Sequence, residues 1–223
     1  MANMRVTDFE NNGYAIVPNV LSRDEISVLR EEIANLPEDE AVRRRGDAYG
    51  VRNLFQLAPE VRELAAQASL RKLVEPILGP NCFAVRAILF DKITAANWKV
   101  GWHQDKFIAV REKIDTPRFG PWSKKAGIWQ VIPPVEFMQR MVTLRIHLDD
   151  CTADNGPLRV LPGTHRHGWL DGKVADCRSR VEEVACEAAS GDVLMIRPLL
   201  LHASSPAIAP SHRRVIHLEF AAD

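Results

Sequence analysis

Apolar residues in the first third of the chain keep a helical spacing. Ser22 and Glu25 form the pattern of a capping box, in which the serine caps a helix and the glutamate bonds back to the cap. The apolar positions that follow are three or four residues apart: Ile26, Leu29, Ile33 and Leu36. This spacing predicts a helix with one buried face that begins after Ser22 and ends at Pro37.

A strand, a second helical region and a loop are predicted around this helix. Residues 13–18 combine β-branched and aromatic side chains with a closing proline, which predicts a short strand. A second helical region is predicted over residues 60–78, where a Gly-Pro pair ends it. The charged residues 38–58, which lie between the two helical regions, are predicted to form an exposed loop.

From residue 81 onward the pattern changes to short apolar runs separated by Gly, Pro, Asn and Asp. Such runs predict strands bounded by turns, here at residues 82–91, 98–104, 142–149, 157–161, 181–185, 192–197, 199–203 and 213–220. Helices followed by about eight strands predict a mainly β fold, and the simplest architecture is a double-sheet jelly roll flanked by the N-terminal helices. The length of 223 residues suits one domain over residues 1–223.

Residues 106–141 interrupt the rhythm of short strands. This segment is long for a plain connection and is rich in aromatic residues and proline. Long segments between the elements of a compact domain are usually either functional or disordered. The aromatic content favours a function, so we predict that residues 106–141 form a lid over a substrate site.

The balance of charge bears on the class of partner. Lys and Arg together number 29, as do Asp and Glu, so the formal net charge is zero. Proteins that bind nucleic acid or a membrane surface normally have a basic excess, so neither partner is predicted, although a local basic patch stays possible. The apolar runs are too short to span a bilayer.

Cysteine usage indicates a reducing compartment. The four cysteines, Cys82, Cys151, Cys177 and Cys186, are scattered and form no C-x-x-C pair. This pattern is typical of free thiols rather than of a disulfide framework or a zinc site. The first residues show no apolar stretch of the kind found in secretory signals, so a cytoplasmic location is expected.

His103 and Asp105 are the first candidates for chemistry. They lie two positions apart in a predicted strand, so their side chains are expected on the same face. Two histidines and one carboxylate suit non-haem Fe(II), so a second histidine is needed. The pair alone is a weak signal, because a surface or capping pair has the same spacing.

His202 is the best candidate for the second histidine, because it follows the buried run Leu199–Leu201. Such a histidine is often only a satisfied core residue. The strand that begins at Arg213 can pair with the strand carrying His202, and an arginine fork suits a carboxylate ligand. Period two places Arg213 and Arg214 on opposite faces, so only one of them can serve an interior ligand.

Taken together, these residues resemble the phytanoyl-CoA dioxygenase family of Fe(II)/2-oxoglutarate oxygenases. His103-x-Asp105, His202 and an arginine eleven positions later are similar to the family's site pattern. The stretch from Leu148 to Gly168 resembles the family's D-D-x-x-x-x-N-G-x-L-x-x-x-P-G-S/T-H sequence. The N-terminal strand with its following helix also matches, and the resemblance extends from about residue 8 to 220.

The resemblance implies a double-stranded β-helix, a variant of the jelly roll, that holds iron through His103, Asp105 and His202. It further implies that Arg213 binds the distal carboxylate of 2-oxoglutarate. The other co-substrate contacts that the resemblance implies are Ser204, Gln104 and, on the inward face of the strand at 142–149, Thr143 and Arg145.

The activity implied by the resemblance is the hydroxylation of a C–H bond in a small-molecule substrate. Fe(II), 2-oxoglutarate and O₂ would be required, with release of succinate and CO₂. Related halogenases lack the carboxylate ligand, so Asp105 favours hydroxylation. The family name does not fix the substrate, because the segment 106–141 is longer here than in many members.

Three alternatives remain open from the sequence. His165 and His167 form a rival His-x-His metal pair within a predicted turn. His147, His217 and Glu219 are expected to be structural or supporting residues rather than ligands. The chain could also be a catalytically silent, cupin-like jelly roll that binds a metal or ligand, although such a protein would have no reason to keep all four site residues.

Overall fold

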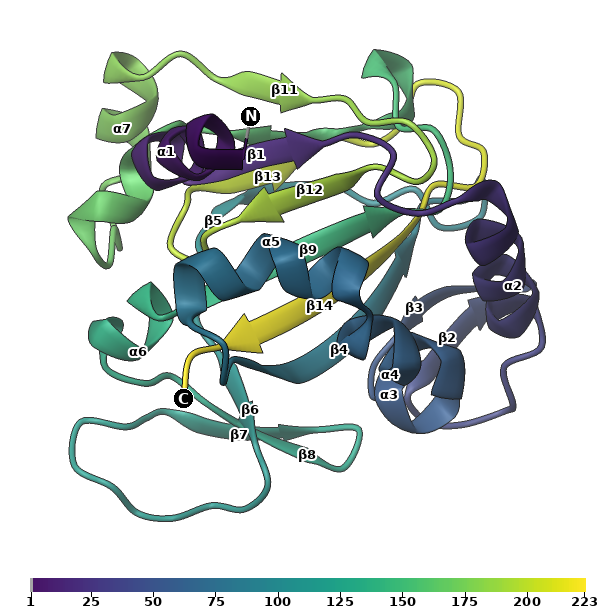
Figure 1. Ribbon diagram of the computed structural model, residues 1–223, viewed down its shortest axis with the longest axis horizontal. Helices are drawn as coiled ribbons and strands as arrows, with labels where there is room; N and C mark the ends of the chain where they lie inside the picture. Colours follow the sequence, from purple (N-terminus) through teal and green to yellow (C-terminus); the bar gives the residue numbers. More distant parts are fainter. Residues whose placement is uncertain (1) are drawn as a thin grey trace.

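Two facing antiparallel sheets form the core of the molecule (Figure 1). The structure is a computed structural model that describes residues 2–223, with side chains from residue 6 onward. The larger sheet has seven strands in the order β1 (Tyr14–Val17), β12 (Val193–Ile196), β9 (Met141–His147), β14 (Arg214–Ala221), β4 (Phe83–Asp91), β3 (Asp47–Val51) and β2 (Val42–Arg45). The smaller sheet has four strands in the order β11 (Val184–Cys186), β10 (Leu158–Val160), β13 (His202–Ser204) and β5 (Val100–His103). The predicted jelly-roll class is confirmed.

Side chains alternate between the two faces of the central strands, so that one face is apolar and the face between the two sheets is polar. On β9 the residues Val142, Leu144 and Ile146 belong to the main hydrophobic core. The residues between them, Thr143 and Arg145, are also buried but point to the other face, between the two sheets. Because both faces of β9 are covered, its polar residues lie inside the molecule rather than in water.

Helices cover the outer face of the larger sheet, where α5 crosses β9 and β14 (Figure 1). The helices are α1 (Ala2–Asn12), α2 (Arg23–Ala34), α3 (Leu54–Leu57), α4 (Pro59–Ala66), α5 (Ala68–Leu78), α6 (Val135–Gln139) and α7 (Val174–Arg180), with 3₁₀ turns η1 (Ala153–Asn155) and η2 (Thr164–His167). The predicted capping box is confirmed, since Ser22 accepts from the Glu25 backbone and the Glu25 carboxylate accepts from the Ser22 backbone.

Several sequence-based boundaries differ from the structure. The loop predicted at 38–58 is wrong, because this segment contains β2, β3 and α3. The helical region predicted at 60–78 is divided into α4 and α5 at Gln67, whose backbone is extended. Leu199–Leu201 are buried, but β13 begins only at His202, and α1 and α7 were not predicted.

Residues 106–141 form ordered elements rather than a bare loop. They contain a three-stranded sheet in the order β6 (Ile108–Val110), β8 (Ile128–Val131) and β7 (Trp122–Lys125), followed by α6. This small sheet lies beside the edge of the sandwich (Figure 1). The Asn53 side chain donates to Ala126 O at the tip of the β7–β8 hairpin, at 2.6 Å.

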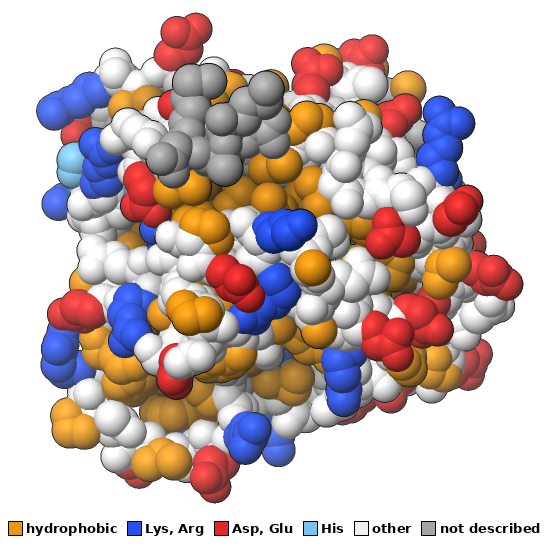
Figure 2. Space-filling view, in the orientation of Figure 1, with side chains coloured by type: hydrophobic (Ala, Val, Ile, Leu, Met, Phe, Trp, Pro, Cys, Tyr) orange, Lys and Arg blue, Asp and Glu red, His pale blue; other side chains and the backbone are white. Residues whose placement is uncertain are grey.

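Acidic and basic side chains are interspersed over the face that carries the helices (Figure 2). This distribution agrees with the zero formal net charge of the sequence. Within residues 2–223, none of the helices combines the length and the apolar character needed to cross a membrane.

Gln104 connects β5 to two neighbouring loops. Its amide nitrogen donates to Gly168 O at 2.8 Å and to Leu199 O at 2.6 Å, and its amide oxygen accepts from Leu170 N at 2.8 Å. The side chain is 5% exposed. These bonds hold the segment before β13 and the segment after η2 against the end of β5, so Gln104 fixes the relative positions of the site-bearing elements.

We predict that Gln104→Ala destabilises the fold by about 1–3 kcal/mol, because the buried Leu199 carbonyl, the half-buried Gly168 carbonyl and the buried Leu170 N–H lose their partner. Urea unfolding followed by circular dichroism measures this change. Gln56→Ala, an exposed position on α3, is the matched control and is expected to change stability by less than about 0.5 kcal/mol. An unchanged unfolding free energy for Gln104→Ala would contradict the structural role.

Candidate active site

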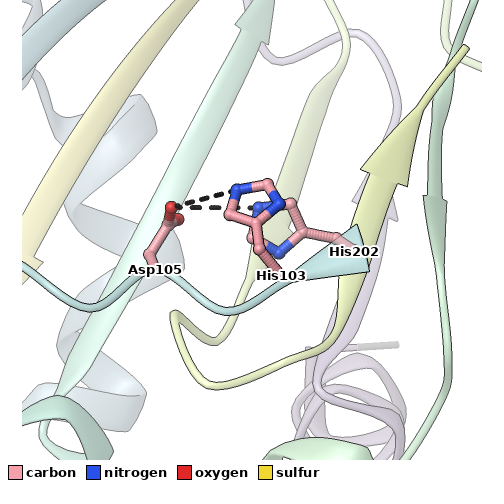
Figure 3. A group of neighbouring side chains, drawn as sticks. All are labelled: His103, Asp105 and His202. Atoms are coloured by element: carbon pink, nitrogen blue, oxygen red, sulfur yellow. Dashed lines mark ion pairs between the residues drawn. The ribbon is translucent and has the colours of Figure 1, made fainter. Parts of the chain in front are cut away.

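Three side chains, His103 and His202 from two paired strands and Asp105 from the residues after β5, point toward one another (Figure 3). His202 begins β13 and lies directly opposite His103, the last residue of β5. Asp105 follows β5, and its backbone N–H donates to Pro198 O at 2.9 Å. Nε2 of His103 and Nε2 of His202 lie 3.8 Å and 3.9 Å from Asp105 Oδ1. One ligand atom from each residue lies within 4.8 Å of the other two, so a single ion can contact all three.

Backbone carbonyls orient both imidazole rings. His103 Nδ1 lies 2.9 Å from Gly101 O, and His202 Nδ1 lies 2.8 Å from Leu200 O. In each ring the protonated Nδ1 donates to the carbonyl, which leaves the lone pair of Nε2 free to bind a metal. The two rings are 4.2 Å apart between centroids and thus present their Nε2 atoms to the same space.

The protonation states suit metal binding. Burial lowers the pKa of His202 to about 4, so its imidazole is neutral at neutral pH. Burial alone would raise the pKa of Asp105, but His202, His217, His103 and Arg86 lower it below its usual value. The buried Oδ2 of Asp105 has no hydrogen-bond partner within residues 2–223. Two imidazoles that present Nε2 and a carboxylate with an unsatisfied oxygen fit a non-haem Fe(II) ion.

A cavity of about 210 Å³ extends from the three ligands into the interior. Its walls include Arg213 and Ser204, two residues that the sequence analysis expected to contact a co-substrate. Arg213 is 3% exposed, donates from Nη1 to Gly156 O at 2.6 Å, and keeps Nε without a partner in the described chain. The cavity that contains the metal ligands therefore also offers a buried guanidinium.

Lys92 is a buried cation near Arg213 that the sequence did not predict. Its ammonium donates to Ser204 Oγ at 3.2 Å and to the backbone carbonyl of Ser205. Burial, followed by the charge of Arg213, lowers the pKa of Lys92 to about 7. Gly156 makes room for this arrangement, because a Cβ there would lie 2.5 Å from Ser205 O and 3.1 Å from Lys92 Nζ.

Arg145 belongs to a polar network on the cavity floor. Its Nη1 contacts His217 Nδ1 at 3.1 Å, His217 Nε2 lies 3.3 Å from Glu219, and Glu219 forms a two-pronged ion pair with Arg86. Burial, followed by the charge of Arg213, lowers the pKa of Arg145 to about 10. His217 and Glu219 therefore support Arg145, as the sequence analysis expected of supporting residues.

Other expected residues lie elsewhere. Gln104, which the resemblance implies as a co-substrate contact, does not line this cavity: period two turns it away from the metal ligands, and its amide nitrogen and oxygen bond to backbone groups. Thr143 shares the inward face of β9 with Arg145, and its hydroxyl is buried without a partner in the described chain, but it does not line the 210 Å³ cavity. Arg214 points away and forms a fork-to-fork ion pair with Asp149 at 2.8 Å.

The remaining histidines take no part in the cluster. Burial lowers the pKa of His147 to about 3, so this side chain is neutral within the sandwich. His165 lies in η2 and its Nε2 is 3.2 Å from Glu10 O. Among residues 2–223, the only group of three potential ligands close enough for one ion is His103, Asp105 and His202. The rival pair at His165 and His167 is therefore not part of such a group.

A wider cavity of about 660 Å³ lies outside the three ligands. It shares His103, Asp105 and Trp98 with the inner cavity. Strands β2 and β3 supply much of its far wall, including Arg43 and Arg52. The sequence did not predict this wall, because residues 38–58 were expected to form a loop, although the arginine run at 43–45 is visible in the sequence.

Solved structures share this fold. AviO1 from Streptomyces viridochromogenes Tue57 superposes with a TM-score of 0.71 at 25% identity, over 99% of this chain and 95% of that one. EctD from S. alaskensis, solved with 2-oxoglutarate and 5-hydroxyectoine, superposes with a TM-score of 0.77 at 20% identity, over 100% of this chain and 76% of that one.

Curated relatives are named as dioxygenases. Ectoine dioxygenase of Stutzerimonas stutzeri is 25% identical over 171 residues, which cover 73% of this chain and 50% of the relative. Peroxisomal phytanoyl-CoA dioxygenase of Rattus norvegicus is 24% identical over 243 aligned positions, which cover 95% of this chain and 66% of the relative. The chain thus spans about half the length of the ectoine dioxygenases it matches.

A family model described as Phytanoyl-CoA dioxygenase (PhyH) matches residues 9–215. The match includes β5, β13 and Arg213, and therefore every residue of the cluster and of its arginine. It confirms the resemblance drawn from the sequence motifs, and the chain belongs to the phytanoyl-CoA dioxygenase family.

Proposed function

We propose that this chain is an Fe(II)- and 2-oxoglutarate-dependent dioxygenase that hydroxylates a C–H bond of a small molecule and releases succinate and CO₂. One observation carries the proposal: His103, Asp105 and His202 converge within bonding reach of one ion, beside a cavity that contains the buried Arg213. The named activities of the relatives and the structure of EctD with 2-oxoglutarate support it.

In this proposal, His103 Nε2, His202 Nε2 and the Asp105 carboxylate hold the iron. Bound iron with 2-oxoglutarate and O₂ supplies the oxidative decarboxylation and the oxygen atom that is inserted. The carbonyls of Gly101 and Leu200 keep the two Nε2 lone pairs pointed at the metal. The chain's own contribution would therefore be a ligand set that backbone hydrogen bonds hold in place beside the cavity.

Arg213 is the proposed anchor for the distal carboxylate of 2-oxoglutarate. Its unpartnered Nε and its remaining donors can form two parallel bonds to a carboxylate. Ser204 Oγ and the Lys92 ammonium lie beside it, and Arg145 adds positive charge at the floor. A dianionic co-substrate would offset these buried cations, which repel one another in its absence.

We further propose that residues 1–223 act as one oxygenase domain and that residues 106–141 form its lid. The bond from Asn53 to Ala126 O brings the β7–β8 hairpin to the sheet edge, and Lys125 of this hairpin lines the outer cavity. The hairpin thus supplies part of the wall around a bound substrate. A cytoplasmic location is proposed as well, in keeping with four cysteines that are all free thiols.

The alternative of a silent jelly roll makes the opposite experimental prediction. Such a protein would bind metal without consuming 2-oxoglutarate. The donor-rich Arg213 cavity favours turnover, because binding a metal alone requires no buried anchor for a second ligand.

We predict that Asp105→Ala lowers iron-dependent succinate release by more than about 100-fold, since groups that only support a ligand already cost roughly 10- to 100-fold. Succinate release from 2-oxoglutarate under air, with and without Fe(II), measures the loss. Asp24→Ala, at an exposed position in the first turn of α2, is the matched control and should keep wild-type release. Wild-type activity in Asp105→Ala would show that the ligand assignment is wrong.

We predict that Arg213→Lys raises the 2-oxoglutarate concentration needed for half-maximal succinate release by about 10-fold or more, because a lysine cannot form the two parallel bonds. Anaerobic titration of the Fe(II) protein, followed through the weak visible charge-transfer absorption, gives the same comparison without turnover. Arg214→Lys is the control, since Arg214 binds Asp149 outside the cavity. If Arg214→Lys weakened 2-oxoglutarate and Arg213→Lys did not, the anchor would have to be reassigned.

A further inference from the structure

One wall of the outer cavity is strongly basic. Four of the residues that line this space of about 660 Å³ are cations: Arg43, Arg45, Arg52 and Lys125. Its one carboxylate is Asp105, which the proposed enzyme uses to bind iron. The cavity therefore concentrates positive charge in a chain whose formal net charge is zero.

The pairing of β2 with β3 places Arg43 and Arg52 on the same side of the sheet edge. Arg43 of β2 lies opposite Gly50 of β3, and Arg52 N donates to Ala41 O at 2.9 Å. Arg43 and Arg52 are consequently diagonal neighbours across the pair, on one face. The edge of the sheet thus presents two guanidinium groups side by side to the cavity.

These guanidinium groups lack a counter-charge. Neither Arg43 nor Arg52 forms an ion pair in the part of the chain that the structure describes, whereas eight other arginines do: Arg30, Arg71, Arg86, Arg118, Arg159, Arg180, Arg197 and Arg214. Burial lowers the pKa of Arg52, and the like charges of Arg43 and Arg86 lower it further. Like charges held together without a partner are unfavourable, and an anion bound between them would relieve the repulsion.

An aromatic surface lies in the same cavity. The rings of Tyr49 and Trp98 are 5.9 Å apart between centroids, and the Arg45 guanidinium lies 5.6 Å from the Tyr49 ring. A β-bulge at Tyr49 lets both Tyr49 and the adjacent Gly50 face the cavity, where strict alternation would allow only one. Trp98 lines the inner cavity too, so the aromatic surface extends to the metal ligands.

We propose that the outer cavity binds a substrate that carries an oxyanion, a phosphate or a carboxylate, on an apolar or planar body. Arg43 and Arg52 bind the oxyanion, and Tyr49 and Trp98 contact the body, which brings its C–H bonds to the end of the cavity formed by His103 and Asp105. The inference rests on the proposed oxygenase function and adds the chemical class of its substrate.

The test uses the protein loaded anaerobically with Fe(II) and saturating 2-oxoglutarate, so that the co-substrate occupies the Arg213 cavity. Isothermal titration calorimetry then compares three probes of similar body: phenyl phosphate, benzoate and benzyl alcohol. We expect at least one of the two anions to bind about 10-fold or more tightly than the neutral alcohol, because bonds to charged groups are the strong ones. The tighter of the two anions identifies the oxyanion as phosphate or carboxylate.

Variants locate the bound anion. Arg43→Gln/Arg52→Gln should weaken the preferred anion by about 10-fold or more and leave benzyl alcohol within about twofold. Arg23→Gln/Lys72→Gln removes the same charge from exposed positions on α2 and α5 and is expected to change anion affinity by less than about twofold. Should the double variant at the cavity fail to fold, Arg43→Gln alone, at an exposed edge position, should weaken the anion by about threefold or more.

Equal affinity for the anions and the alcohol would overturn the inference, as would unchanged anion affinity in a folded Arg43→Gln/Arg52→Gln protein. Succinate release by the wild-type protein tests the oxygenase function separately. Succinate release without any preference for anions would overturn the substrate class alone. Anion binding at these arginines without iron-dependent succinate release would support the site and overturn the oxygenase.

Discussion

The antiparallel pairing of β5 with β13 is the constraint on which the site depends. It places His202 directly opposite His103, although almost half of the chain lies between them. The bond from Asp105 N to Pro198 O then fixes the carboxylate at the start of the turn that leads into β13. Because backbone hydrogen bonds set these positions, the three ligands are arranged before any metal binds. The free energy needed to bring the ligands together is therefore part of the folding free energy.

Charge inside the sandwich is distributed unevenly. On the floor, Arg86 and Glu219 neutralise each other, and His217 links this pair to Arg145. Elsewhere around the cavity, Lys92 and Arg213 bond mainly to neutral oxygens of Ser204, Ser205 and Gly156. Buried cations without acidic partners destabilise a fold, so this half of the interior is arranged for an anionic ligand rather than for maximal stability.

Much of the fold could be predicted from the sequence wherever a buried face produces a regular spacing of apolar residues. The capping box at Ser22 and the apolar runs of β4 and β14 are local signals, and the structure contains all three elements. Strands β2 and β3 escaped notice because they form a basic sheet edge, where one face carries arginines instead of an apolar alternation. Lys92 was missed for a related reason: a single buried lysine produces no pattern, and only the folded chain shows what surrounds it.

At the candidate site, the alternation of side chains along a strand and the resemblance to a family give different expectations for one residue. Period two directs Gln104 away from the face shared by His103 and Asp105, and in the structure its amide bonds to backbone groups of neighbouring loops. The distinction between Arg213 and Arg214 follows the same rule. Contacts between distant segments, such as Lys92 with Ser204, depend on strand order in the sandwich and have no counterpart in local sequence.

Gly156 adopts φ +62° and offers its carbonyl to Arg213. The turn at Asn155-Gly156 thus orients the side chain of Arg213, which lies far away in the sequence. A larger residue there would displace the Ser205 carbonyl and crowd the lysine ammonium. A substitution at this one position would therefore have the same effect as losing the arginine itself. A homologue or library variant can then be inactive even though its metal ligands and its arginine are intact. Screens that score only the reactive side chains would misjudge such a protein.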